Sequence, residues 1–171
     1  NGIAFSSDEA FAFLYQDIKE LNGNVLSIEE NEKNIWLGGE SVIAKVDKST
    51  NEIKIVDQRN GLPKDKITAL FLDRNNKLWI GTEKSGVYQL NTQTNSIQKL
   101  FSSANSLENT VNSISGSDEQ VYVATKNGVL VFDLLTGEKT LFGTSQGLPH
   151  NDIRFVYLDS YKNPWVATKS N

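Results

Sequence analysis

An aromatic residue recurs at a fixed interval along this chain of 171 residues. Trp36, Trp79, Tyr122 and Trp165 each stand 43 residues from the next. A sustained period of this order, within roughly 20 to 50 residues, is typical of proteins built from stacked structural repeats. One such spacing would be weak support, but three equal steps are strong. The repeat therefore constrains the fold more than any other feature of the sequence.

Short apolar runs surround each aromatic anchor. The anchors lie in Ile-Trp-Leu-Gly-Gly (35–39), Leu-Trp-Ile-Gly-Thr (78–82), Val-Tyr-Val-Ala-Thr (121–125) and Pro-Trp-Val-Ala-Thr (164–168). An alternating apolar run precedes each of them, at 25–28, 67–71, 111–114 and 153–157. Runs that are short, rich in β-branched and aromatic residues, and bounded by Gly, Asn and Asp are typical of strands. The anchor and its upstream run therefore predict two strands per unit.

Two more strands follow each anchor. The third strand is expected at 41–46, 86–90 and 128–132, and the fourth at 52–56, 97–101 and 139–142. Four antiparallel strands in each repeat describe a blade of a β-propeller. A large flat side chain at the anchor suits packing between neighbouring sheets. The predicted fold is all-β, with propeller blades of four antiparallel strands.

The ends of the chain resemble half units. Whole units are expected at 25–66, 67–110 and 111–152, with half units at 1–24 and 153–171. The halves could meet in one blade and close a four-bladed ring, or the chain could be an arc of a larger ring. We favour the arc, a partial propeller. Because an arc leaves strand edges bare, self-association through open edges is expected.

Composition excludes several classes of protein. The formal net charge of −4 argues against a nucleic-acid binder, which normally carries a basic stripe. No run of about 18 apolar residues predicts a membrane span. Cysteine is absent, which removes disulfides and thiolate metal sites. Methionine is absent too, and no signal peptide begins at Asn1, so a processed chain or an excised piece is expected.

One family resembles the repeat. Asn-Gly-Leu-Pro at 60–63, a Val/Ile strand, Asp73, Leu-Trp-Ile-Gly-Thr at 78–82 and Gly-Val at 86–87 together resemble the two-component regulator propeller repeat. The copy at 60–86 is the best, and the copy at 146–168 is good. Unit one has Gly-Glu-Ser at 39–41, and unit three has glycine and tyrosine in place of the aspartate and tryptophan.

The resemblance implies a function for the chain. Repeats of this family build the periplasmic sensor region of hybrid two-component histidine kinases of Bacteroidetes, similar to receptors for oligosaccharides. It thus implies an extracytoplasmic, non-enzymatic part of an inner-membrane protein, with an oligosaccharide ligand and no cofactor. A non-catalytic scaffold for protein–protein interaction stays open as the alternative. An enzyme is disfavoured, because no cluster of His, Tyr and carboxylate residues converges on one loop face.

The expected ligand face follows from propeller geometry. The loop entering the first strand and the loop between the second and third strands lie at the same end of a blade. Their amide and charged groups suit sugar hydroxyls, and the cations suit a uronic acid or sulfate. The ordinary alternative is a set of solvated loop residues. The candidates are Asn60, Lys64, Asp65, Lys66, Glu83, Lys84, Lys126, His150, Asn151, Asp152 and Arg154, with Asn105, Glu108, Asn109 and Gln146 beside them.

Other conspicuous residues are assigned structural roles. Trp36, Trp79, Tyr122 and Trp165 are expected between blades rather than as sugar platforms. Six residues before the anchor stand Glu30, Asp73, Gly116 and Asp159, and the carboxylates are expected to cap turns. Gly61 and Gly147 belong to the repeated loop before the first strand. The single histidine, His150, cannot build a His-based metal site alone, so no metal is expected.

Overall fold

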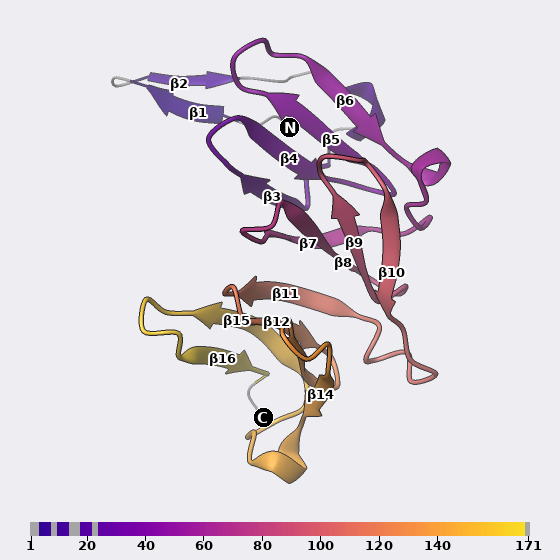
Figure 1. Ribbon diagram of the computed structural model, residues 1–171, viewed down its shortest axis with the longest axis vertical. Helices are drawn as coiled ribbons and strands as arrows, with labels where there is room; N and C mark the ends of the chain where they lie inside the picture. The colour runs from indigo at the N-terminus through magenta and orange to yellow at the C-terminus, as the bar shows by residue number, and fades with distance from the viewer. Residues whose placement is uncertain (1–3, 8–9, 14–17, 22–23, 170–171) are drawn as a thin grey trace.

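The computed structural model describes residues 4–7, 10–13, 18–21 and 24–169, and its regular elements there are strands and three short 3-10 turns (Figure 1). The first complete unit is β3 (Ser27–Glu30), β4 (Asn34–Gly38), β5 (Ile43–Asp47) and β6 (Ile53–Val56). The second is β7 (Ile67–Leu72), β8 (Lys77–Thr82), β9 (Val87–Asn91) and β10 (Ile97–Phe101). The third is β11 (Val111–Gly116), β12 (Gln120–Thr125), β13 (Gly128–Asp133) and β14 (Lys139–Phe142). The all-β prediction is confirmed.

Each complete unit is one antiparallel four-stranded sheet in which sequence neighbours pair. Two two-stranded sheets accompany them, β1 (Ala4–Ser7) with β2 (Ala10–Phe13), and β15 (Ile153–Leu158) with β16 (Pro164–Thr168). The 3-10 turns are η1 (Lys19–Leu21), η2 (Gln58–Asn60) and η3 (Thr144–Gln146). Every sheet lies inside one of the ranges expected for the whole and half units.

Successive sheets meet along their first strands. The Ser27 hydroxyl donates to the carbonyl oxygen of Ile67 at 3.1 Å, and the Thr68 hydroxyl donates to that of Val111 at 2.7 Å. The Asn112 side chain donates to the carbonyl of Ile153 at 2.6 Å. These bonds link β3 to β7, β7 to β11 and β11 to β15. The first strands therefore form the inner side of the arc, as in a propeller.

The core consists of layers between neighbouring sheets. Trp36 is 1% exposed and packs in a cluster with Ile67, Leu70 and Leu78 of the second unit. Trp79 is 2% exposed and meets Phe132 of the third unit edge-on, with ring centroids 5.0 Å apart. Trp36 and Trp79 therefore fill the space between blades.

A small residue stands two positions after each anchor, and packing requires it. A Cβ added to Gly38 would lie 2.7 Å from Cγ2 of Ile67, and one added to Gly81 would collide with Cγ1 of Val111. Ile67 and Val111 are fully buried first-strand residues of the next unit. The sheets therefore approach each other most closely at this position.

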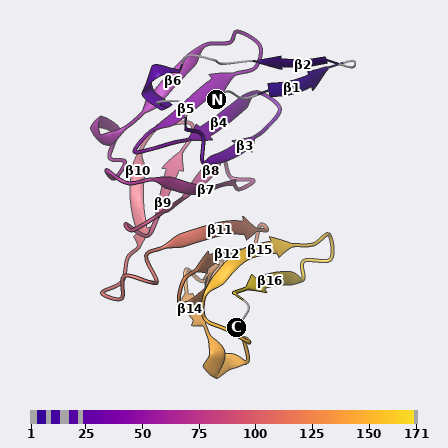
Figure 2. The ribbon, with the colours of Figure 1, turned by 180° about the vertical axis from the view of Figure 1, so that it is seen from behind.

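The chain forms an open arc. In Figures 1 and 2 the sheet β1–β2 and the sheet β15–β16 lie at opposite ends of the molecule, beyond the first and third complete units. They stay separate two-stranded sheets and do not join into one blade. The partial propeller is the observed arrangement, and the four-bladed ring is not formed.

The turn residues of units one and three differ from the prediction. In β7–β8 the pair before the turn is Leu72 with Leu78, whereas in β3–β4 it is Glu30 with Ile35. Glu30 is therefore still in its strand, and its carboxylate binds Lys48 instead of capping a turn. The turn of unit one is one residue shorter, and Asn31 takes the place of Asp73. Its Oδ1 accepts the N–H groups of residues 33 and 34.

The same displacement occurs in unit three. Gly116 pairs with Val121 inside the sheet, and the Ser117 hydroxyl accepts the N–H groups of Glu119 and Gln120. The equivalent turn residues are thus Asn31, Asp73, Ser117 and Asp159. The period measured on the aromatic anchor persists because other loops offset the shorter turns.

Candidate functional site

The two loops of the expected ligand face are joined in unit two by Asp65. This carboxylate is 8% exposed and accepts the backbone N–H of Lys66 at 2.9 Å and of Lys84 at 2.7 Å. A carboxylate that is buried and occupied by backbone donors fixes the shape of the loops. Asp65 therefore positions its neighbours and is largely withdrawn from solvent.

Backbone bonds join the same two loops in unit two, in unit three and in the last half unit. The N–H of Glu83 donates to the carbonyl of Lys66, and the N–H of Lys126 donates to that of Thr110. In the last half unit, the N–H of Lys169 donates to the carbonyl of Asp152. The loop before the first strand and the loop after the second strand thus lie at the same end of these blades. This is the arrangement that the choice of candidate ligand-binding residues assumed.

Charged side chains lie at the surface of the loops at this end of the second and third units. Lys66 lies 3.5 Å from Glu83, which also lies 3.5 Å from Lys84. Lys64 and Lys126 are exposed, and neither forms an ion pair with another described residue. Exposed cations at a loop face can attract an anionic ligand.

Two turns of this face are shaped by side-chain caps and left-handed glycines. Asn60 closes η2 by accepting the N–H of Asp57 at 3.1 Å. Gly61 follows with φ of 97°, and Gly147 follows η3 with φ of 100°, both in the left-handed region that favours glycine. The repeated glycines of the loop before the first strand are therefore needed by the backbone.

The candidates of the last half unit also hold one another in place. His150 Nδ1 accepts the N–H of Asp152 at 2.8 Å, and Asp152 Oδ2 accepts from Arg154 at 2.9 Å. Asn151 Oδ1 accepts the N–H of Thr144 at 2.7 Å. His150 is therefore a turn-forming residue whose ring nitrogen serves the backbone.

A polar cavity of about 250 Å³ opens at this end, between the β12–β13 turn and the loop around η3 that leads to β15. Gln146 and Asn151, both expected on the ligand face, contribute to its wall. Asn127, Thr144 and Ser145 join them, and these three were not selected from the sequence. Hydroxyl and amide groups around a shallow cavity can bind sugar hydroxyls through directional hydrogen bonds. In the sequence, the adjacent hydroxyl residues Thr144 and Ser145, between Gly143 and Gly147, are the signal that could have indicated this cavity.

A second cavity of about 380 Å³ lies at the opposite end of the first strands. Its charged groups are already engaged, because Arg74 pairs with Asp118 at 2.5 Å and Asp73 accepts the indole N–H of Trp79 at 2.9 Å. In the last half unit the N–H of Trp165 holds the pKa of Asp159 below its ordinary value. These carboxylates stabilise turns, in keeping with the role expected of Asp73 and Asp159.

No group of His, Asp and Glu among the described residues could hold a metal ion. The helical elements in the described ranges are single 3-10 turns, and none has the length or apolarity to cross a bilayer.

Fold and loop face together define a segment of a β-propeller with a polar end. Residues 61–84 match the model of the family described as two component regulator propeller. These residues contain the clearest copy of the repeat, so the resemblance read from the sequence is confirmed there. No curated protein matches the chain in sequence.

Solved structures share the fold. The extracellular domain of the hybrid two-component system BT4673 from B. thetaiotaomicron is 19% identical, with a TM-score of 0.55 over 92% of this chain and 28% of that one. The extracellular domain of the hybrid two-component system BT3049 from B. thetaiotaomicron is 19% identical, with a TM-score of 0.61 over 84% of this chain and 27% of that one.

A protein with another role is equally similar in fold. PorZ of Porphyromonas gingivalis, described as a surface component of the type-IX secretion system, is 16% identical, with a TM-score of 0.66 over 83% of this chain and 19% of that one. The chain therefore spans less than a third of the length of each of these relatives, and at such identities the similarity concerns the fold.

Proposed function

We propose that this chain is a ligand-sensing propeller segment from the extracytoplasmic region of a hybrid two-component sensor histidine kinase. The match of residues 61–84 to the two component regulator propeller family carries the proposal. Two structural relatives, both extracellular domains of hybrid two-component systems, support it. In a Gram-negative cell this region lies in the periplasm, and the kinase belongs to another part of the protein.

The ligand that best suits the loop face is an oligosaccharide with an acidic substituent. The cavity beside Thr144 and Ser145 offers hydroxyl and amide groups, and exposed Lys84 and Lys126 supply positive charge at the same end of the blades. Binding would change signalling only if the ligand has different affinities for two arrangements of the whole sensor. The segment itself binds and performs no chemistry.

Calorimetric titration with neutral and uronic-acid oligosaccharides tests this proposal. We expect dissociation constants between about 1 µM and 1 mM, which correspond to about −8 to −4 kcal/mol. The double variant Lys84→Ala/Lys126→Ala should weaken binding of the acidic sugars more than that of the neutral ones. Lys33→Ala, an exposed lysine at the opposite end of the first unit, is the matched control. Equal losses in both variants would place the ligand elsewhere.

A protein-interaction scaffold is the second candidate. The similarity in fold to PorZ, a surface component of the type-IX secretion system, favours it. If calorimetry detects no binding to any of the sugars, and the chain binds stably to a protein from the same cell envelope, the scaffold would be supported over the sensor.

A further inference from the structure

The loops that lead from a fourth strand to the next first strand differ in how they are filled. Strand register makes three of their residues equivalent: Gln58, Ser103 and Thr144. In unit one, the amide nitrogen of Gln58 donates to the carbonyl of Ser41 at 2.8 Å, so it spans the gap to the loop after the second strand. In unit two, Asn109 binds Ser103 twice, because Oδ1 accepts its N–H at 2.7 Å and Nδ2 donates to its carbonyl at 2.8 Å. Both loops are therefore closed by their own side chains.

The equivalent space in unit three stays open. Thr144 stands where unit one has Gln58, and its side chain is too short to span the same gap. Gly143 stands where unit one has Asp57, and it must be small because an added Cβ would lie 2.8 Å from Oδ1 of Asn151. These small residues line the polar cavity of about 250 Å³ beside η3. The cavity is therefore a feature of this loop sequence and not of the repeat in general.

Two amide side chains of the cavity wall present free donors. Asn151 Oδ1 accepts the backbone N–H of Thr144 at 2.7 Å, and its Nδ2 has no partner among the described residues. Gln146 Oε1 accepts the N–H of Gly143 at 2.8 Å and the hydroxyl of Ser145 at 2.9 Å, and its Nε2 has no partner in the described ranges. Because only an amide oxygen can accept from a backbone N–H, both side chains are held with an NH₂ group available.

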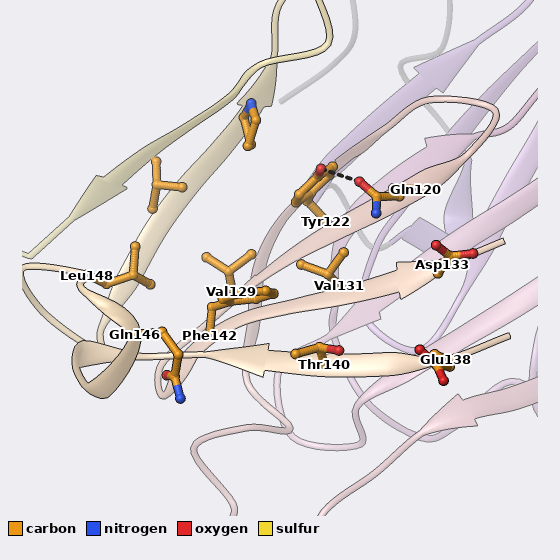
Figure 3. A pocket seen from close by; sticks show the side chains of 12 residues that line it. Gln120, Tyr122, Val129, Val131, Asp133, Glu138, Thr140, Phe142, Gln146 and Leu148 are labelled. Carbon is orange, nitrogen blue, oxygen red and sulfur yellow. Dashed lines mark hydrogen bonds between the residues drawn. The ribbon is translucent and has the colours of Figure 1, made fainter. Parts of the chain in front are cut away.

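The remaining amide of the wall has the opposite polarity. Asn127 Nδ2 donates to Glu108 at 3.1 Å, so Oδ1 of Asn127 is the atom that stays available, with no donor to it from the described part of the chain. Gln146 also borders an adjoining apolar cavity of about 510 Å³, and in Figure 3 its amide nitrogen points away from Leu148 and Phe142. The polar cavity thus offers donors from the loop around η3 and an acceptor from the β12–β13 turn.

An acetamido group matches this wall. Its carbonyl oxygen accepts, its N–H donates, and its methyl group is apolar, as is Leu141 of β14, which also lines the cavity. A carboxylate suits it less well, because none of the described lining residues is charged and an unpaired charge is costly to enclose. Pockets for drug-sized ligands measure about 300–1,000 Å³, so a cavity of this size suits one sugar residue.

We propose that this cavity binds the acetamido group of an N-acetylhexosamine residue within the oligosaccharide. Asn151 and Gln146 donate to the carbonyl oxygen, and Asn127 accepts the N–H. Leu141 contacts the methyl group. The inference rests on the proposed sugar-binding role of this face and names the kind of sugar residue that it selects. Acidic substituents stay outside the cavity, where Lys126 is exposed.

Calorimetry with a matched pair of neutral disaccharides tests the inference. N,N′-Diacetylchitobiose and cellobiose share the same linkage, and the first has an acetamido group in place of one hydroxyl on each ring. We expect the chain to bind diacetylchitobiose at least about tenfold more tightly, because a site built to hydrogen-bond a group discriminates against an analogue that lacks it.

Conservative variants remove the donors and keep the turn. Asn151→Asp retains an oxygen for the N–H of Thr144, and Gln146→Glu retains the oxygen that closes η3. Each should weaken binding of diacetylchitobiose at least about fivefold, the effect of one hydrogen bond, and leave binding of cellobiose nearly unchanged. Thr144→Gln copies the side chain that spans unit one and should remove the preference. Gln93→Glu, at an exposed turn at the opposite end of unit two, makes the same chemical change and is the matched control.

NMR of the side-chain amides tests the position of the ligand. The NH₂ signals of Asn151 and Gln146 should shift when diacetylchitobiose is added, whereas those of Gln93 should not.

Each other result is decisive. Equal affinity of the parent chain for both disaccharides, or an unchanged preference in Asn151→Asp and Gln146→Glu, overturns the acetamido site and leaves sugar binding by the face intact. If both variants lose a uronic-acid oligosaccharide and keep diacetylchitobiose, the cavity holds a carboxylate, and the inference is wrong. Failure to bind any sugar rejects the inference together with the proposed function.

Discussion

Two indole groups in equivalent surroundings differ in one hydrogen bond. The N–H of Trp79 donates to Asp73 Oδ2 at 2.9 Å, whereas the buried N–H of Trp36 has no acceptor among the residues that the structure describes. The turn residue of unit one is Asn31, whose only acceptor oxygen already serves two backbone N–H groups. A buried donor without a partner costs about 1–3 kcal/mol.

Asn31→Asp should therefore stabilise the protein. The carboxylate can keep both turn bonds and present its second oxygen to Trp36, so we expect the free energy of unfolding to rise by about 1 kcal/mol in urea denaturation. The reciprocal change Asp73→Asn should lower it by about 1–2 kcal/mol. A stable Asn31→Asp variant with no gain, beside a clear loss for Asp73→Asn, would show that the two turns hold their indoles differently.

Two tryptophans at equivalent positions should respond differently to deletion. Trp79→Ala should cost about 3–5 kcal/mol of unfolding free energy, because a large aromatic is removed from between two sheets. Trp165→Ala, at 64% exposure, should cost less than about 1 kcal/mol under conditions where the chain is monomeric. Similar losses in the two melts would contradict the assignment of Trp79 to the blade interface.

Acid should weaken the turn after β5. Hydrogen bonds from Ser49 and Thr50 lower the pKa of Asp47 from 3.8 to about 2. A lowered folded-state pKa contributes stability above about pH 4 that is lost as the pH falls toward 2. Asp47→Asn keeps the acceptor oxygen, as Asn91 does in the second unit, where it accepts from residues 93 and 94. The stability difference between parent and variant at pH 7 should disappear near pH 2, and a constant difference in urea midpoints would oppose this.

At the scale of the element, the second strand of each unit depends on the small residue after its anchor. Gly81→Val should destabilise the protein by about 1–3 kcal/mol, because the added branches would enter the space of Val111. Gly137→Val, at an open turn position, isolates the cost of backbone strain, because its φ of 77° is a conformation that valine rarely adopts. A larger loss at Gly137 than at Gly81 would show that backbone strain outweighs the contact between sheets.

The strands were predictable because packing dictates their residues. Each of the first two units has an aromatic residue that faces the next sheet, and two positions later a glycine that lies against the first strand of that sheet. Trp36 with Gly38 and Trp79 with Gly81 are these pairs. The turn register was not predictable for units one and three, since Asn31 and Ser117 cap as well as Asp73 and a one-residue deletion leaves the anchor period intact. The polar cavity depends on how Asn151 and Gln146 fold η3, which no repeat pattern records.

At the scale of the whole molecule, stability should fall from the middle of the arc to its ends. A stacked-repeat protein gains stability from each neighbour interface, and interior units have two. Amide hydrogen exchange should therefore be slowest in β8 and β12, and it should be faster in β16, whose sheet has a neighbour on one face. Uniform protection across these strands would indicate a single cooperative unit, or an associated state in which the end is covered.

Because the three tryptophans differ in solvent exposure, their intrinsic fluorescence can report on the state of the protein. The indole of Trp79 is buried and donates to Asp73, and that of Trp36 is buried with no acceptor among the described residues. The indole of Trp165 donates to Asp159 and is 64% exposed to solvent. Solvent quenchers such as iodide should extinguish emission from the third alone. A rise in quenching of the other two during denaturation would report the opening of the blade interfaces in real time, without any attached dye.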